Sequence, residues 1–101
     1  MVIVGGWFEV AAEQREAFLA QQVEGITASR AEPGNIEYAI TADPIEPGRV
    51  VLFERWESQE ALDVHLGVLA SKRGAAPDPD AIAPTALSIV VYSVSGETRL
   101  A

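Results

Sequence analysis

Four stretches of the chain are dense in Val, Ile, Leu and aromatic residues and predict β-strands. They cover residues 2–10, 36–42, 49–57 and 86–96, and polar or turn-forming residues separate them. Residues 43–48, between the second and third stretches, contain two Pro and one Gly. Because Pro presets φ and Gly accepts positive φ, this connector predicts a hairpin.

The segment between the first two strands has the pattern of an amphipathic helix. Residues 11–31 are rich in Ala, Glu and Gln and contain no Pro. The helical spacing gives one apolar stripe, formed by Phe18, Leu19, Val23 and Ile26. We expect the helix to end at residues 32–35, Glu-Pro-Gly-Asn, because the residue before Pro avoids the helical region and Gly suits a left-handed turn.

A second helix is predicted after the third strand. Ser58 is a suitable N-cap, and Glu60 in the first turn complements the helix dipole. An apolar stripe then continues to about Lys72 and is formed by Leu62, His65, Leu66 and Leu69. Residues 73–85 hold three Pro and a Gly, so we expect a loop that is either a lid or a disordered segment.

The order of the predicted elements is strand, helix, strand, strand, helix, strand. This order predicts an α+β fold of the ferredoxin-like βαββαβ type, in which both helices cover one face of a four-stranded antiparallel sheet. The strands, however, are apolar on both faces. In the third strand Val50, Leu52 and Trp56 alternate with Val51 and Phe53, and the last strand behaves in the same way. Two helices can cover only one face, so we expect a second copy of the sheet to cover the other in a homodimer.

Composition narrows the chemistry. The 101 residues fit one domain, residues 1–101, and a hydrophobic share of 49% is enough for a core. The absence of Cys excludes disulfides and thiolate chemistry, and a single His, His65, excludes a His-rich metal site within one chain. No Gly-rich phosphate-binding or dinucleotide motif occurs. We therefore expect no cofactor and no bound metal.

The charge excludes some partners. A formal net charge of −8 opposes binding to nucleic acid and to anionic membrane surfaces. The N-terminal residues lack the basic region and the cleavage site of a secretory signal. The longest uncharged apolar stretch, residues 86–94, is much shorter than the roughly 20 residues that span a bilayer. These features predict a cytoplasmic protein.

Three segments together carry a family resemblance. They are residues 32–38 (EPGNIEY), 47–58 (PGRVVLFERWES) and 60–66 (EALDVHL). In order and spacing they resemble the antibiotic biosynthesis monooxygenase (ABM) domain family, within the dimeric α+β barrel superfamily. The resemblance implies a small cofactor-independent monooxygenase that oxidises a phenolic, quinol or polyketide-type aromatic with O₂.

The resemblance also implies roles for particular residues. The substrate would lose a proton and pass an electron to O₂ in a dry pocket that supplies a proton acceptor and hydrogen bonds. His65 and Trp56 are the candidate catalytic residues, and Tyr38, Trp7 and Glu54 are the candidate substrate-binding residues. A neutral imidazole at His65 would accept the phenolic proton.

Each candidate also has a purely structural interpretation. His65 lies on an apolar helix stripe and would be a packed histidine, Trp56 would fill the core, and Glu54 would be a hydrogen-bonding hub. Tyr38 and Trp7 would seal the core or a dimer face. A non-catalytic dimeric binding or accessory domain therefore remains an alternative, as does an isomerase on the same scaffold. A cavity beside His65 and Trp56 would favour an enzyme.

Haem chemistry is disfavoured within the resemblance. Haem-degrading members of the family use an Asn on the first strand, where this chain has Gly5 and Gly6. They also use a ligating His on the second helix, whereas the only His of that helix here, His65, comes early.

Overall fold

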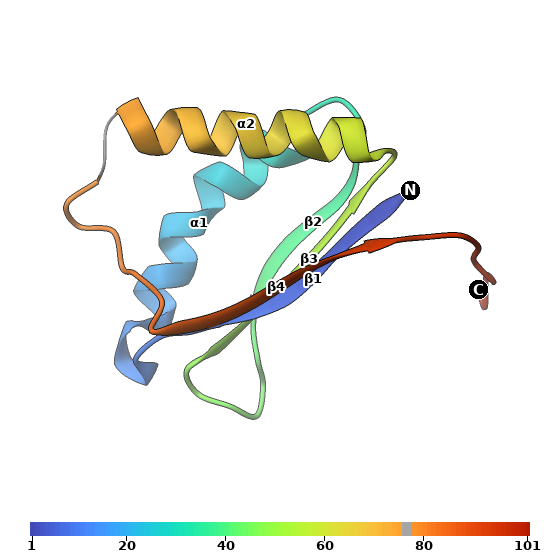
Figure 1. Cartoon of the computed structure of the whole chain (residues 1–101). Coiled ribbons are helices and arrows are strands. Elements are labelled where there is room, and N and C mark those ends of the chain that lie inside the picture. Colours follow the sequence, from blue (N-terminus) through green and yellow to red (C-terminus); the bar gives the residue numbers. More distant parts are fainter. Residues whose placement is uncertain (76–77) are drawn as a thin grey trace.

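The computed structural model describes residues 1–75 and 78–101 and has the predicted order of elements (Figure 1). The elements are β1 (Val2–Glu9), a short 3₁₀ helix η1 (Ala12–Gln14), α1 (Arg15–Arg30), β2 (Asn35–Ala42), β3 (Arg49–Trp56), α2 (Gln59–Ala75) and β4 (Ala86–Ser93). The predicted βαββαβ arrangement is therefore confirmed.

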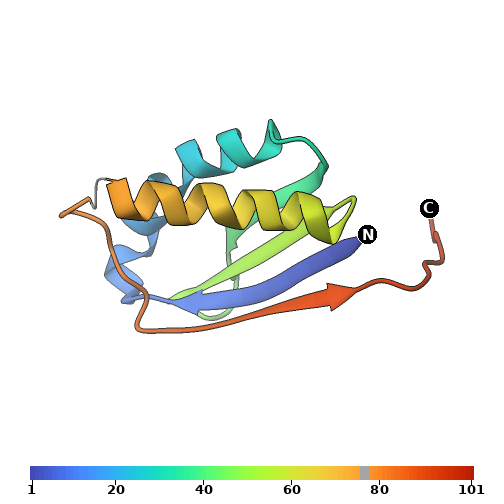
Figure 2. The same cartoon turned by 45° about the horizontal axis from the view of Figure 1, so that its top comes forward.

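The four strands form one antiparallel sheet in the order β2-β3-β1-β4. The predicted hairpin between β2 and β3 is present, and β2 and β4 are the two edge strands. Both helices lie on the same side of the sheet (Figures 1 and 2). The opposite face of the sheet has no covering element among the described residues, as expected when both helices lie on one side.

Beyond the row that contains Trp56 and Val2, the strand register aligns the helix-facing side chains in three rows across the sheet. From β2 to β4, the rows are Tyr38–Glu54–Val4–Val91, Ile40–Leu52–Gly6–Ile89 and Ala42–Val50–Phe8–Leu87. The first row is the only one of the three that carries polar side chains. Because this row lies near the start of α2, polar groups concentrate at one end of an otherwise apolar surface.

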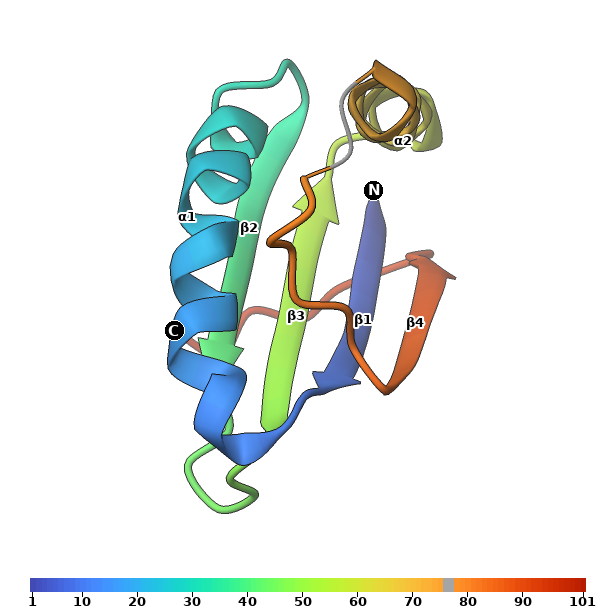
Figure 3. The same cartoon turned by 90° about the vertical axis from the view of Figure 1, so that its left-hand side faces the viewer.

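The two helices pack differently on this surface. α1 packs closely along β2, whereas α2 approaches the sheet closely only at β3. The buried core consequently concentrates under α1 and under the first turns of α2, where Trp56 and Leu62 are fully buried. Figure 3 views α2 along its axis and shows it standing above β1 and β4.

The turn between α1 and β2 is fixed against the start of α2. Gly34 has a positive φ of 84°, as the Pro-Gly sequence predicts. A Cβ at this position would lie 2.6 Å from the Cβ of Ala61, so a larger residue would collide with α2. The Glu57 amide also donates to the Gly34 carbonyl over 2.8 Å. These contacts hold Glu32, two residues earlier, beside α2.

The loop predicted over residues 73–85 differs from expectation at its start. Residues 73–75 continue α2, since no Pro interrupts the helix there, and residues 76–77 lie outside the described part of the chain. The segment 78–85 has no helix or strand but is anchored to α1. The side chain of Gln21 donates to the Asp80 carbonyl over 3.0 Å and accepts from the Ile82 amide over 3.0 Å.

Within residues 1–75 and 78–101, neither helix combines the length and apolarity needed to cross a membrane.

Candidate functional site

A cavity of about 560 Å³ lies between α2 and the helix-facing side of the sheet. A volume of this size is typical of small-molecule sites. Its walls come from all four strands, both helices and the segment 78–85. The apolar lining is formed by Val4, Phe8, Phe18, Ile40, Leu52, Leu62, Leu66, Leu69, Ile82, Pro84, Leu87, Ile89 and Val91.

Three polar side chains meet at one end of this cavity. Tyr38 and Glu54 are neighbours in the first row of the sheet, and His65 reaches them from the second turn of α2. The rings of Tyr38 and His65 have their centroids 5.5 Å apart in an edge-on arrangement. His65 is only 1% exposed, so this end of the cavity is shielded from solvent.

Two carboxylates flank the His65 ring. Nδ1 lies 2.9 Å from Oε2 of Glu32, and Nε2 lies 3.9 Å from Oε1 of Glu54. The first distance is a hydrogen bond and the second is too long to be one. A neutral imidazole that donates from Nδ1 to Glu32 keeps its lone pair on Nε2. The arrangement therefore presents a proton acceptor beside Glu54 and Tyr38.

Trp56 lies behind this polar cluster and not on the cavity wall, so the expectation that it lines the pocket is corrected. Its side chain is fully buried, and its ring centroid is 4.7 Å from that of His65. The indole Nε1–H donates to Oε1 of Glu54 over 2.9 Å. Trp56 lies on the helix-facing side of the sheet with Leu52, as predicted, but only Leu52 of the two lines the cavity.

Trp7 is not brought together with the other candidates, and this expectation is also corrected. It lies on the face of the sheet opposite to the cavity, because its neighbours Val4 and Phe8 alternate with it along β1. The guanidinium of Arg49 lies 4.5 Å from the centre of the Trp7 ring, a cation–π contact. Arg49 also pairs with Glu9 over 2.9 Å.

Burial sets the protonation behaviour of the cluster. Burial, followed by the nearby charge of Glu54, raises the pKa of Tyr38 to about 12. Tyr38 is therefore a neutral hydroxyl at pH 7 and can donate a hydrogen bond. Burial also raises the pKa of Glu54, and the Trp56 hydrogen bond and the charge that His65 carries when its ring is protonated partly oppose this increase.

Glu54→Gln is expected to remove a pH dependence of stability. A raised pKa means that the folded protein holds the Glu54 proton more tightly than the unfolded chain does. The wild type should thus lose stability relative to the variant as pH rises through the raised pKa, by an amount on the order of 1 kcal/mol. Gln still accepts from Trp56 but does not ionise. Urea unfolding between about pH 4 and about pH 8 measures this difference.

An exposed acid provides the control for this measurement. Glu24→Gln removes a carboxylate from the solvent face of α1 and should leave the pH profile parallel to that of the wild type. Parallel profiles for Glu54→Gln as well would contradict the proton affinity assigned to Glu54.

Sequence reasoning missed three polar residues of the site, Glu32, Arg73 and Gln22, the last of which lines the cavity from α1. Glu32 was recognised only as part of the turn that ends the first helix, and its contact with His65 depends on how that turn docks on α2. Arg73 lines the cavity but falls just beyond the predicted helix end. Extending the stripe by four residues from Leu69 would have found it, because i and i+4 share a helix face.

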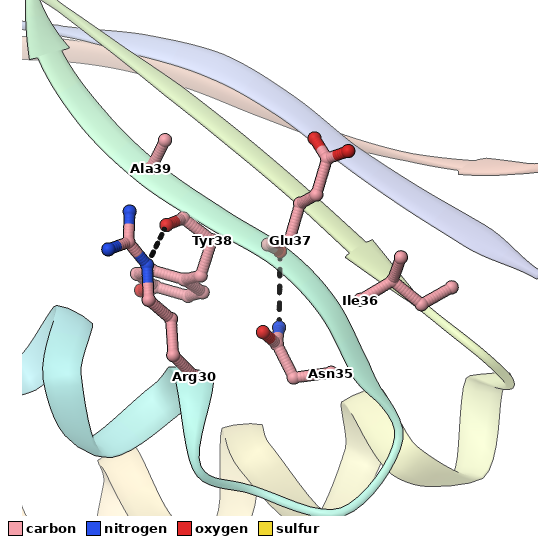
Figure 4. A pocket seen from close by; sticks show the side chains of 6 residues that line it. All are labelled: Arg30, Asn35, Ile36, Glu37, Tyr38 and Ala39. Atoms are coloured by element: carbon pink, nitrogen blue, oxygen red, sulfur yellow. Dashed lines mark hydrogen bonds between the residues drawn. The ribbon is translucent and has the colours of Figure 1, made fainter.

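A second hollow, of about 390 Å³, lies along the outer edge of β2 (Figure 4). Arg30 Nε donates to the Tyr38 carbonyl over 2.9 Å, and Asn35 Nδ2 donates to the Glu37 carbonyl over 3.1 Å. Both side chains thus satisfy main-chain carbonyls of an edge strand. The Tyr38 side chain points away from this hollow toward the core, and we assign the hollow no chemistry.

Across residues 1–75 and 78–101, no group of three or more His, Asp or Glu side chains has an arrangement that would hold a metal ion.

The chain is similar in sequence to a known protein family and to proteins of other organisms. The sequence pattern of the family described as "Antibiotic biosynthesis monooxygenase" (ABM) matches residues 1–76. The chain is 31% identical over 94 residues to the uncharacterized protein sll1783 of Synechocystis sp., and the match covers 93% of this chain and 63% of that protein. It is also 31% identical over 65 residues to "Putative monooxygenase YcnE" of Bacillus subtilis, covering 64% of this chain and 68% of that protein.

A solved structure shares the fold over the whole chain. A Deinococcus radiodurans protein described as a "putative antibiotic biosynthesis monooxygenase" superimposes with a TM-score of 0.80 at 25% sequence identity. The superposition covers 100% of this chain and 99% of the other. The predicted ferredoxin-like fold is confirmed by this similarity.

Proposed function

The chain belongs to the antibiotic biosynthesis monooxygenase family, and on that premise we propose that it is a cofactor-independent monooxygenase acting on a phenolic, quinol or polyketide-type aromatic. The observation that carries this proposal is the His65 ring, held between two carboxylates at the polar end of an apolar cavity of about 560 Å³. A flat apolar substrate would fill the cavity and place its hydroxyl among the polar groups.

His65 is the proposed general base. Glu32 accepts the Nδ1 proton and so holds the ring with Nε2 directed toward the cavity end. The substrate hydroxyl would give its proton to Nε2, and Glu32 would stabilise the resulting imidazolium. Glu32 is a positioning residue, because it acts through His65.

The neighbouring groups would favour the substrate anion. The neutral hydroxyl of Tyr38 would donate a hydrogen bond to the developing oxyanion. Such a hydrogen bond is stronger in a site shielded from water. Glu54 borders the same position, and burial raises its pKa. Trp56 holds Glu54 through its indole N–H and is therefore a second positioning residue.

The oxidation then needs no reductant other than the substrate. For an anthrone, the anion gives one electron to O₂, and the resulting radical and superoxide combine into a peroxide anion at the ring carbon. This anion takes the proton back from the His65 imidazolium and becomes a hydroperoxide. Loss of water leaves a carbonyl, so one oxygen atom of O₂ enters the product and the other leaves as water. The ring methylene supplies both electron pairs, and the two hydrogens it loses leave in that water.

We propose that two copies of the chain form a homodimer through the uncovered face of the sheet. The uncovered face of the sheet carries apolar side chains at its centre and toward β4. Phe53 is 38% exposed and Tyr92 is 55% exposed in the single chain. The full set of these side chains is Ile3, Trp7, Val51, Phe53, Val90 and Tyr92. A second copy of this self-complementary face would bury them.

A haem-degrading function fits these residues poorly. The only His is 1% exposed, its Nδ1 is bonded to Glu32, and its one remaining nitrogen, Nε2, is the atom to which we assign the substrate proton. A side chain in place of Gly6 is also excluded, because a Cβ there would lie 2.2 Å from the Ser88 carbonyl oxygen of β4. We derive no step through haem.

Oxygen uptake tests the proposed function. Purified protein is mixed with anthrone or 1,4-naphthalenediol, and O₂ consumption and product formation are recorded after subtraction of autoxidation. We expect one O₂ consumed for each anthrone converted, at the same rate with and without a metal chelator.

The alternatives give different results in the same experiment. An accessory or binding domain would bind the aromatic compound without consuming O₂. An isomerase would convert a substrate at the same rate under anaerobic conditions. Either result would refute the monooxygenase proposal.

A further inference from the structure

The cavity has a cationic residue at the end of α2 opposite to His65. The cavity-facing stripe of α2 runs through Leu62, His65 and Leu69 and then reaches Arg73. Arg73 therefore occupies the stripe position at which another apolar residue would continue the pattern. It is the only Lys or Arg among the residues that line the cavity.

The two polar ends are separated by an apolar middle. Arg73 follows His65 by two helical turns, which is about 12 Å along the helix axis. Leu66 and Leu69 of α2 and Leu52 and Ile89 of the sheet line the interval. A ligand that fills this space is apolar in its centre and has a polar group at each end.

The Arg73 guanidinium has no assigned structural partner. In the described segments 1–75 and 78–101, the ion pairs are Arg49–Glu9, Arg55–Glu37 and the two contacts of His65. Asp78 and Asp80 of the following segment form none of these ion pairs. Arg73 is exposed to solvent and lines the cavity, and an arginine at the edge of an apolar cavity is suited to bind a carboxylate.

We propose that Arg73 binds an anionic group of the ligand and that the ligand is a fused-ring phenol with a carboxylate at the end opposite to its hydroxyl. The hydroxyl end of this assignment rests on the proposed function of His65, whereas the anionic end rests on Arg73 alone. A general electrostatic attraction between the protein and anions would not account for binding of this anionic group. The chain carries a net charge of −8 and repels anions at long range.

Binding, and not turnover, tests this inference. The probes are 6-hydroxy-2-naphthoate and its methyl ester, which share the rings and hydroxyl but differ in charge. By titration calorimetry we expect the wild type to bind the acid about 10-fold more tightly than the ester. Arg73→Gln should abolish this preference by weakening the acid alone, and added salt should reduce it in the wild type.

Lys72→Gln is the matched control, since it removes the same charge from the adjacent helix position, which is not part of the lining. It should keep the preference for the acid. Equal affinities of the wild type for acid and ester, binding of neither, or equal losses in both variants would overturn the inference. Oxygen uptake failing while the Arg73-dependent preference persists would refute the proposed oxidation only.

Discussion

Replacement of His65 by Ala should lower kcat for an accepted phenol by about 10²–10⁴-fold, the usual contribution of a general base. The variant removes the one imidazole that faces the polar end of the cavity and leaves no other base with the same geometry. Glu32 reaches the site only through the His65 ring. Steady-state oxygen uptake with anthrone as substrate measures the change.

Two further measurements separate chemistry from folding. His65→Gln keeps most of the side-chain volume and a polar group but does not take up a proton at neutral pH, so it should be as inactive as His65→Ala. Added imidazole should restore part of the activity of His65→Ala, because the deletion leaves space beside the cavity. Unchanged kcat in a folded His65→Gln variant would rule out His65 as the base.

Replacement of Phe53 by Asp should convert the dimer to monomers. Phe53 lies at the middle of β3 on the uncovered face, between the small residues Gly5 and Ala39 on the neighbouring strands. A carboxylate buried there by a second sheet would have no partner and would cost several kcal/mol. Sedimentation should give about twice the chain mass of 10.8 kDa for the wild type and the single mass for the variant.

Ile45→Asp is the control for this change. Ile45 is also an exposed apolar residue, but it lies in the β2–β3 connector and not on the sheet face. This variant should remain dimeric. A wild-type protein that sediments as a monomer at micromolar concentration would contradict the sheet-to-sheet arrangement.

The fold was predictable because apolar residues recur with a clear periodicity along each helix and strand. The alternation in β3 assigned Leu52 and Trp56 to one face and Phe53 to the other, and the structure agrees. The same reasoning applied strictly to β1 would have separated Trp7 from the pocket. Trp7 alternates with Val4 and Phe8, so a cavity on their side of the sheet excludes it.

The site was less predictable because its geometry depends on contacts between distant segments. Glu32 meets His65 only because Gly34 docks tightly on Ala61, and no local pattern encodes that contact. Trp56 has the expected orientation, yet depth within the core decides whether a side chain reaches the cavity. Periodicity gives the face of an element and not this depth.

The most direct test of the central claim uses the fact that the chain has a single histidine. With ¹⁵N-labelled protein, the two nitrogens of His65 give the only imidazole signals, which identify the tautomer without assignment. Under anaerobic conditions, we expect Nδ1 to carry the proton and Nε2 to be unprotonated. Titration with 1,4-naphthalenediol should then shift the Nε2 resonance most. An Nε2 resonance that stays unchanged at saturating diol would contradict the account, because the bound hydroxyl would then lie away from the proposed base.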